Sequence, residues 1–202
     1  FDGYKNNPGY AIKTILAAQA AKADCIILCD TNGGTLPEEV TKIVKEVRKK
    51  IKIQLGIHTH NDQDLAVANS LAAINAGCVQ VQGTFNGLGE RCGNADLCTI
   101  MAIAHTKMKY KSIPENQIKN LMDAAYYISE VSNYTIQGNH AFIGHSAFAH
   151  KGGVHIDAML KNPKAYEHID PELVGNHRRL LTSELAGKMP IILKAAKLNI
   201  VL

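Results

Sequence analysis

Residues 52–62 read KIQLGIHTHND, and this stretch decides the fold that the sequence predicts. Apolar and polar residues alternate along it, which is typical of a β-strand with one buried face. Leu55 and Ile57 share the face expected to pack against helices, whereas His58 and His60 share the opposite face. The sequence therefore predicts a strand that brings two imidazoles to its carboxyl end.

Two similar apolar runs flank this strand. Residues 24–30 begin 28 residues before it, and residues 78–84 begin 26 residues after it, with helical patterns between the runs. This alternation is typical of parallel strands joined by helical crossovers. The segment CIILCDT at 25–31 aligns with CVQVQGT at 78–84, an offset of 53 residues that equals two strand–helix units. Repeating units of this size predict an α/β fold of the (β/α) barrel type.

The sequence also marks where the helices of this half begin and end. Asn7 before Pro8 predicts the start of the first helix, and Thr35 with Glu38 is typical of a capping box for the second. Gly77 stands where the third helix is expected to end.

The number of strands predicts only part of a barrel. A complete (β/α)8 barrel takes about 250 residues, and three strands are visible before the pattern changes near residue 110. Residues 1–110 are therefore expected to form the C-terminal part of a TIM barrel, its last three strands, in a fragment that lacks the N-terminal half. Residues 111–202 are expected to form a small, mainly helical subdomain, with one amphipathic helix over 114–131.

Composition excludes several classes of protein. Apolar residues make up 46% of the 202 residues, and no apolar run approaches the roughly 18 residues that span a bilayer. The net charge of +4 is scattered, which argues against nucleic acid as a partner. Five cysteines, an odd number, predict free thiols and a cytoplasmic protein. Cys29, Cys92 and Cys98 are expected to be small core residues, not nucleophiles or soft metal ligands.

The histidine pair is the strongest chemical signal. His58 and His60 lie about 7 Å apart at their Cα atoms on one strand face, near enough to chelate one divalent cation. A pair of hydrogen-bonded histidines is the competing interpretation, and the motif alone leaves both open. Parity along the strands also predicts that Thr31 and Thr84 point inward, at the strand ends where such barrels carry their chemistry.

Two further motifs allow weaker interpretations. The glycine-rich segment NGLGERCGN at 86–94 could receive an anion, but a tight connection is the commoner role of such a turn. Glu90 and Arg91 are expected to hold the rim together as an ion pair, and Asn94 is expected to cap the next helix.

Four histidines in the second half recur at a constant interval of five residues. Residues five apart on a helix differ by about 140° in direction, so separate roles are expected for these four: His140, His145, His150 and His155.

Four motifs in this order resemble the isopropylmalate, homocitrate and citramalate synthase family, which are metal-dependent acyl-CoA condensing enzymes. They are LCDTNGGTLP at 28–37, HTHND at 58–62, GTFNGLGERCGN at 83–94 and AHKGGVHIDAM at 149–159. The segment SELAGK at 183–188 looks most like the citramalate synthase type.

The resemblance implies a role for each matching residue. His58 and His60 match the family's metal ligands, Asn94 matches an asparagine on or near the metal, and Thr31 matches a threonine that binds the carboxylate of the 2-oxoacid. His155 and Tyr166 match a histidine and a tyrosine that the helical subdomain delivers to the partner protomer for proton transfer, which implies a homodimer. The family's catalytic arginine and metal-binding aspartate are expected to precede Phe1.

The implied reaction is the condensation of acetyl-CoA with a 2-oxoacid, followed by thioester hydrolysis, in branched-chain amino-acid biosynthesis. Pyruvate is the favoured acceptor, giving citramalate, and the cation would be Zn, Mn or Mg. Isopropylmalate or homocitrate synthesis with another 2-oxoacid, and a retro-aldol cleavage like that of hydroxymethylglutaryl-CoA lyase, are the alternatives among enzymes. A non-catalytic interaction module is the alternative from another class.

Overall fold

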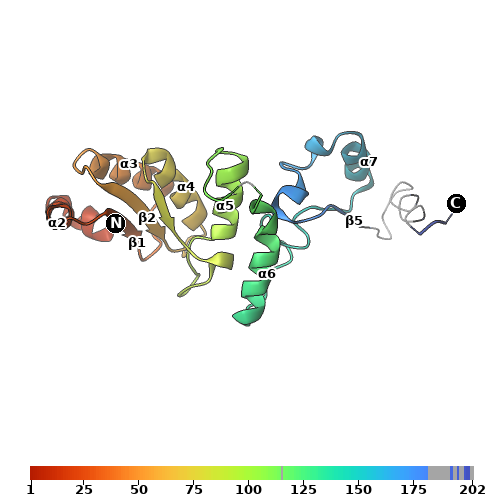
Figure 1. Ribbon diagram of the computed structural model, residues 1–202, viewed down its shortest axis with the longest axis horizontal. Coiled ribbons are helices and arrows are strands. Elements are labelled where there is room, and N and C mark those ends of the chain that lie inside the picture. The colour runs from red at the N-terminus through yellow and green to blue at the C-terminus, as the bar shows by residue number, and fades with distance from the viewer. Residues whose placement is uncertain (115, 182–191, 193–194, 196–197, 201–202) are drawn as a thin grey trace. The chain divides into compact units, whose positions relative to one another are not determined.

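The computed structural model describes residues 1–114, 116–181, 192, 195 and 198–200, and it forms two compact units, Phe1–Ile100 and Met101–Leu202 (Figure 1). The division falls inside helix α5, Leu97–Thr106. The expected domain boundary at residue 110 stays a prediction. The SELAGK motif at 183–188 lies outside the described residues. No helix among the residues that the structure describes is long and apolar enough to cross a membrane.

The first unit alternates helices and strands, as the sequence predicts. Its elements are α1 (Asp2–Asn6), α2 (Pro8–Ala20), β1 (Cys25–Asp30), α3 (Pro37–Arg48), β2 (Gln54–Thr59), α4 (Ala66–Ala76), β3 (Gln80–Gln82) and the 3-10 turn η1 (Phe85–Gly87). The strands form one parallel sheet in the order β1-β2-β3. In this register His58 lies between Cys29 of β1 and Gln82 of β3. The parallel-strand prediction is confirmed.

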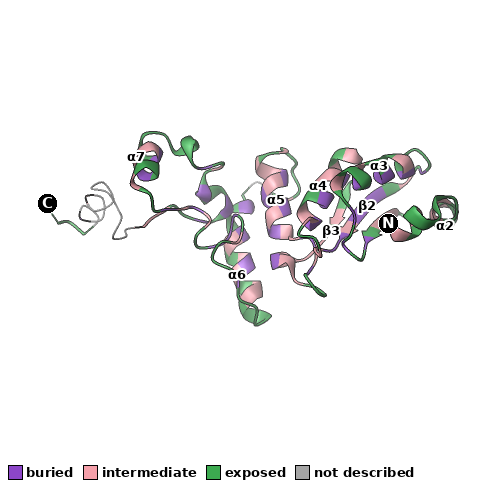
Figure 2. Ribbon diagram, turned by 180° about the vertical axis from the view of Figure 1, so that it is seen from behind, coloured by how far each residue is buried: buried purple, intermediate pink, exposed green. Residues whose placement is uncertain are grey.

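The core of this unit lies between the sheet and its helices. Val40, Val44 and Val47 of α3 are fully buried and belong to one cluster with Leu55 and Ile57 of β2 (Figure 2). Because Leu55 and Ile57 face the helices, the residues that alternate with them face the other side of the sheet. The predicted division of the strand into an apolar and a polar face is therefore confirmed.

Helix starts were predicted with mixed success. Asn7 caps α2 as expected, since its side chain accepts a hydrogen bond from the Tyr10 N–H at 3.0 Å. The capping box of α3 is wrong by one residue: Pro37 occupies the first helical position, so the Glu39 carboxylate, not that of Glu38, accepts from the Leu36 N–H at 3.1 Å. Gly77 ends α4 in the left-handed conformation, φ +115°, as predicted.

The third strand is shorter than residues 78–84. After Gln82 the backbone turns to pair with the segment that follows the glycine-rich loop, and the Thr84 N–H donates to the Ala95 carbonyl at 3.0 Å. Asn94 does not cap α5. The Asp96 carboxylate does so, because it accepts from the N–H groups of Cys98 and Thr99 at 3.1 and 3.0 Å.

Where the structure describes it, the second unit is mainly helical with one small parallel pair of strands. Its elements are η2 (Ile118–Asn120), α6 (Leu121–Val131), β4 (Ala149–His150), α7 (Gly153–Lys161), η3 (Pro163–Ala165), η4 (Pro171–Val174) and β5 (Arg179–Leu180). The helix predicted over 114–131 begins later, at Leu121, directly after the 3-10 turn η2, and ends at Val131 as predicted.

Candidate active site

The two histidines of β2 converge at the carboxyl end of the sheet. Their Nε2 atoms lie 3.2 Å apart and their ring centroids 5.1 Å apart, with the rings edge to face. His60 is 9% exposed and His58 is half-buried. Burial, and then the proximity of His60, lower the pKa of His58, so this ring is neutral at neutral pH. Neutral imidazole is the form that binds metal ions.

The distance between the two nitrogens fits a shared cation. If each Nε2 lay about 2.1 Å from an ion, a separation of 3.2 Å would correspond to an angle of about 100° at the ion, close to the tetrahedral value. The same distance also fits a hydrogen bond between the rings. A third group is therefore needed to distinguish the two interpretations, and the described residues contain no cluster of three His, Cys, Asp or Glu side chains that could hold a metal.

Asn94 is a candidate for this third group, because it carries an amide oxygen and is paired with His60. It forms an antiparallel bridge with His60, flanked by backbone hydrogen bonds from Asn61 to Gly93 at 2.9 Å and from Ala95 to Thr59 at 3.0 Å. Its Nδ2 donates to the Leu88 carbonyl at 3.1 Å, but its Oδ1 is buried without a hydrogen-bond partner. Leaving a buried acceptor without a partner costs free energy. A cation bound by the two imidazoles and this amide oxygen would remove that cost.

The glycine-rich loop leaves space for the Asn94 side chain because Gly89 has no Cβ atom. A Cβ atom on Gly89 would lie 2.2 Å from Asn94 Nδ2, and the φ of Gly89, +159°, is unfavourable for other residues. The loop is thus a close connection that seats the Asn94 amide. This fits the commoner interpretation of the motif, a tight connection.

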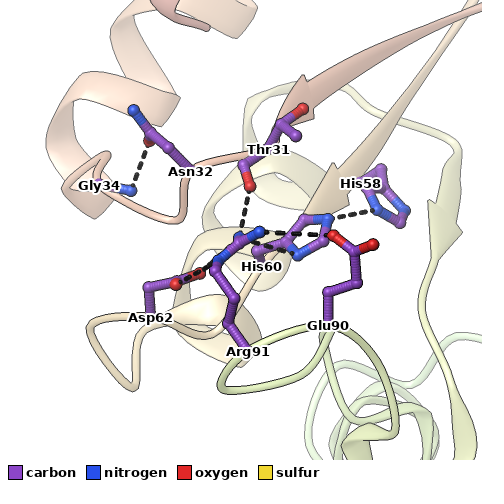
Figure 3. A network of polar contacts seen from close by, with 8 residues as sticks. All are labelled: Thr31, Asn32, Gly34, His58, His60, Asp62, Glu90 and Arg91. Atoms are coloured by element: carbon purple, nitrogen blue, oxygen red, sulfur yellow. Dashed lines mark hydrogen bonds and ion pairs between the residues drawn. The ribbon is translucent and has the colours of Figure 1, made fainter.

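Arg91 joins the ends of all three strands (Figure 3). Its Nε and Nη2 donate to the two Asp62 carboxylate oxygens at 2.7 and 2.9 Å, and Nη2 also donates to the Thr31 carbonyl at 2.7 Å. Glu90 lies 3.6 Å from Nη1 but is almost fully exposed, so Asp62 is the stronger partner. The predicted ion pair between Glu90 and Arg91 is confirmed, and Asp62 is a closer partner of Arg91 that the sequence analysis missed.

Arg91 also lies beside His60. Its Nη2 is 3.3 Å from His60 Nδ1, and because a guanidinium can only donate, Nδ1 would be the acceptor in a hydrogen bond between them. A neutral His60 would then carry its proton on Nε2, facing His58 Nε2, and binding a cation through His60 Nε2 would require this proton to leave that atom. The hydrogen bond from Arg91 lowers the pKa of Asp62, which keeps the pair charged at neutral pH.

Thr31 lies directly after β1 at the same edge of the sheet. It is exposed, and its backbone carbonyl rather than its hydroxyl contacts Arg91. The loop after it is held by buried Asp30, whose carboxylate accepts from the Thr35 hydroxyl at 2.6 Å, and by Asn69, whose amide donates to the Thr35 carbonyl at 2.8 Å. Sequence reasoning missed this support. The signal that could have found it is a polar residue within an apolar run, as Asp30 and Asn69 are.

The cysteine prediction is partly wrong. Cys98 is buried, and burial raises its pKa to about 12, so it is an inert core residue as expected. Cys29 and Cys92 are exposed. Cys29 alternates with the helix-facing residues of β1 and therefore lies on the open face of the sheet, opposite His58 in the register. All five cysteines are free thiols.

His155 and Tyr166 meet in the second unit. Their rings stack with centroids 4.4 Å apart and an angle of 29° between the planes. His155 is exposed on α7, and Tyr166, just after η3, is 44% exposed. The other three histidines of the series have separate contacts, as predicted: His140 with the Ala141 carbonyl, His145 with Tyr126, and His150 with Glu167.

Comparison with known protein families gives two matches. A family described as HMGL-like matches residues 3–128, and one described as homocitrate synthase post-HMGL domain-like matches residues 142–202. The chain is 56% identical over 200 residues to the (R)-citramalate synthase of Geobacter sulfurreducens and 50% identical over 201 residues to that of Aquifex aeolicus. Each alignment covers 99% of this chain and 38% of the relative, so the chain spans well under half the length of these proteins.

A solved structure supports the fold. An HMG-CoA lyase from Acenitobacter baumannii, in complex with coenzyme A and 3-methylmalate, is similar with a TM-score of 0.54 and 22% sequence identity, over 62% of this chain and 43% of that one. The predicted α/β class, part of a TIM barrel followed by a mainly helical part, is confirmed by the family match and by this fold.

Proposed function

The chain belongs to the HMGL-like family, and from this premise we propose that the protein containing it condenses acetyl-CoA with a 2-oxoacid and hydrolyses the thioester. Pyruvate is the proposed acceptor and citramalate the product, since the relatives reported above are (R)-citramalate synthases. The single observation that carries the proposal is the 3.2 Å approach of His58 Nε2 and His60 Nε2 at the carboxyl end of a parallel sheet, beside Asn94, which is bridged to His60 and whose Oδ1 has no hydrogen-bond partner.

These three residues are the proposed holders of a divalent cation, Zn, Mn or Mg, with further ligands from outside this chain. When bound, such a cation would polarise the keto group of the acceptor. Thr31, at the same edge of the sheet, is proposed to bind the acceptor's carboxylate through its exposed hydroxyl. Arg91 and Asp62 hold the Thr31 loop beside His60, which would orient the acceptor toward the cation site.

His155 and Tyr166 are proposed to move the proton. An exposed imidazole within reach of the thioester methyl group can act as a base, and the stacked tyrosine would orient the ring or relay the proton. Their exposure supports the further proposal that they act in the barrel of a partner protomer, so that the protein works as a homodimer. Free thiols are consistent with a cytoplasmic location, which belongs to the same proposal.

The first test is His58→Ala in the full-length protein. We expect loss of both bound metal and citramalate formation, measured by elemental analysis after desalting and by release of free CoA with acetyl-CoA and pyruvate. His177→Ala, which removes an exposed histidine of the second unit, is the matched control and should leave both unchanged. Normal turnover with metal still bound in His58→Ala would refute the proposal.

An acceptor screen tests the substrate. Free CoA should appear fastest with pyruvate, compared with 2-oxoisovalerate and 2-oxoglutarate. A preference for either of the others would identify an isopropylmalate or homocitrate synthase, and cleavage of a hydroxyacyl-CoA without pyruvate-dependent release of CoA would identify a lyase. Absence of any metal affinity in the full-length protein would favour an interaction module.

A further inference from the structure

The proposed chemistry leaves the buried carboxylate of Glu167, in the second unit, without a role. The Glu167 side chain is 2% exposed and lies between His150 and Arg178. Arg178 donates to both carboxylate oxygens, from Nε to Oε1 at 2.6 Å and from Nη2 to Oε2 at 2.5 Å. His150 Nε2 lies 3.0 Å from Oε1.

This carboxylate is charged. Burial alone would raise the pKa of Glu167, but the hydrogen bonds from Arg178 and His150 outweigh it, and the pKa is lowered. A buried carboxylate with three hydrogen bonds from two partners is geometrically well defined, because any displacement leaves a charge unpaired in a poorly solvated place. Glu167 is therefore fixed in position relative to His150 and Arg178.

Its two partners belong to one rigid support. His150 lies on β4, and Arg178 immediately precedes β5. The two strands are joined by backbone hydrogen bonds, from Arg179 to the Phe148 carbonyl at 3.0 Å and from Leu181 to the His150 carbonyl at 2.8 Å. Glu167 is thus attached to both strands of this small sheet.

The same support leads directly to the stacked pair. Helix α7 begins three residues after His150 and carries His155, while Tyr166 is the residue before Glu167. Tyr166 and Glu167 are both held by the η3 turn, because their N–H groups donate to the Pro163 carbonyl at 3.1 and 2.9 Å. A single buried carboxylate therefore connects the strand before His155 to the turn that presents Tyr166.

The stacked pair itself has little to hold it. Among the described residues the His155 ring makes no hydrogen bond, and its ring contact is the stacking on Tyr166. A stacked aromatic contact is worth about 1 kcal/mol, which does not fix two exposed side chains in one geometry. The constraint has to come from the backbone on either side.

We propose that Glu167 is a positioning residue: held by Arg178 and His150, it fixes Tyr166 over the His155 ring and so sets the geometry in which the pair meets its substrate. The catalytic use of the pair rests on the proposed function, but the positioning does not, because the stacking can be observed without turnover.

The experiment uses the full-length protein with histidine labelled at Cε1, and Glu167→Gln, which keeps the shape of the side chain and removes its charge. Stacking on Tyr166 should shift the His155 Hε1 signal upfield by its ring current. The signal is assigned by its loss in His155→Gln, and Tyr166→Leu gives its position without the ring. In Glu167→Gln the signal should move at least half of the way to that position, and kcat should fall about 10- to 100-fold, with KM for pyruvate within about twofold of the wild-type value.

Two further variants keep the proposal falsifiable. Arg178→Lys retains the positive charge but loses the bidentate contact, so it should give an intermediate displacement, and it replaces Glu167→Gln if that variant does not fold. Lys161→Gln removes an exposed ion pair with Asp157 from the same helix and should move neither the signal nor kcat. An unmoved His155 signal in both Glu167→Gln and Arg178→Lys would overturn the proposal. A moved signal together with full turnover in His155→Gln would support the positioning and refute the proposed function of the pair.

Discussion

The histidine pair of β2 and the stacked pair of α7 and η3 are supported in different ways. His58 and His60 are neighbours on one strand, and Asn94 and Arg91 reach them directly from the loop after β3. His155 and Tyr166 are exposed, and the buried carboxylate proposed to support them belongs to Glu167, the residue after Tyr166. The first pair is held by residues that contact its imidazoles or pair with its strand, whereas the second pair is exposed and only its neighbour Glu167 is buried.

The sharpest test of this comparison separates retention of the metal from turnover. In the full-length protein, His155→Ala should lower kcat about 10²- to 10⁴-fold, the usual contribution of a general base, with the metal content unchanged. Elemental analysis and a free-CoA assay measure the two quantities on the same sample. Loss of metal in His155→Ala would show that the two pairs are not functionally separate.

Arg91 tests how far the first pair depends on its surroundings. Arg91→Met removes the donor to His60 Nδ1 and releases Asp62, so we expect metal affinity to fall about 10- to 100-fold, as when an outer partner of a ligand is lost. Arg91→Lys keeps the charge and should lose less. Competition with a chelating dye measures the affinity, and equal affinity in all three proteins would contradict a supporting role.

Acid should affect the second region through its anchor. Because the pKa of Glu167 is lowered in the folded protein, the unfolded chain takes up this proton first as the pH falls. The stability that the anchor contributes is present above the ordinary glutamate pKa of about 4.3 and is lost as the pH falls through the lowered value. Urea unfolding should therefore show a gap between wild type and Glu167→Gln that is constant from pH 7 down to about pH 5 and shrinks as the pH falls below about 4.3. A gap that stays constant to the lowest pH at which the protein folds would disprove the linkage.

The smallest expected effect concerns an exposed ion pair. Lys161 and Asp157 lie one turn apart on α7, with Nζ and Oδ2 at 2.8 Å and both side chains largely exposed. Lys161→Gln should change the free energy of unfolding by less than about 0.5 kcal/mol. Thermal melting should then show a larger loss of stability for Glu167→Gln than for Lys161→Gln, because the carboxylate of Glu167 is buried and the ion pair of Lys161 is exposed.

Local patterns predicted much of the first region. The alternation in residues 52–62 predicted both the buried face of β2 and the shared face of His58 and His60, because side chains on a strand alternate strictly. The same kind of reasoning misplaced the cap of α3 by one residue and assigned the cap of α5 to Asn94, not Asp96. Both errors concern single hydrogen bonds, which depend on loop paths that periodicity does not describe.

Partners that are distant in the sequence could not be predicted in this way. Arg91 contacts Asp62 across 29 residues and Thr31 across 60. Cys29 and Cys92 are exposed although both were expected in the core. Glu167 meets Arg178 and His150 across 11 and 17 residues. No periodic pattern links such positions.

By itself, the sequence determined the parallel strand–helix units, the two imidazoles on one face, and the family to which the chain belongs, since these follow from spacing and from the order of short motifs. Only the tertiary structure decided which side chains meet: that Arg91 lies against His60, that Asn94 presents an unpartnered oxygen, and that Glu167 contacts Arg178. The physical reason is that hydrogen bonds to buried charged and polar groups act over 2.5–3.3 Å in space, at separations along the chain that only folding brings together.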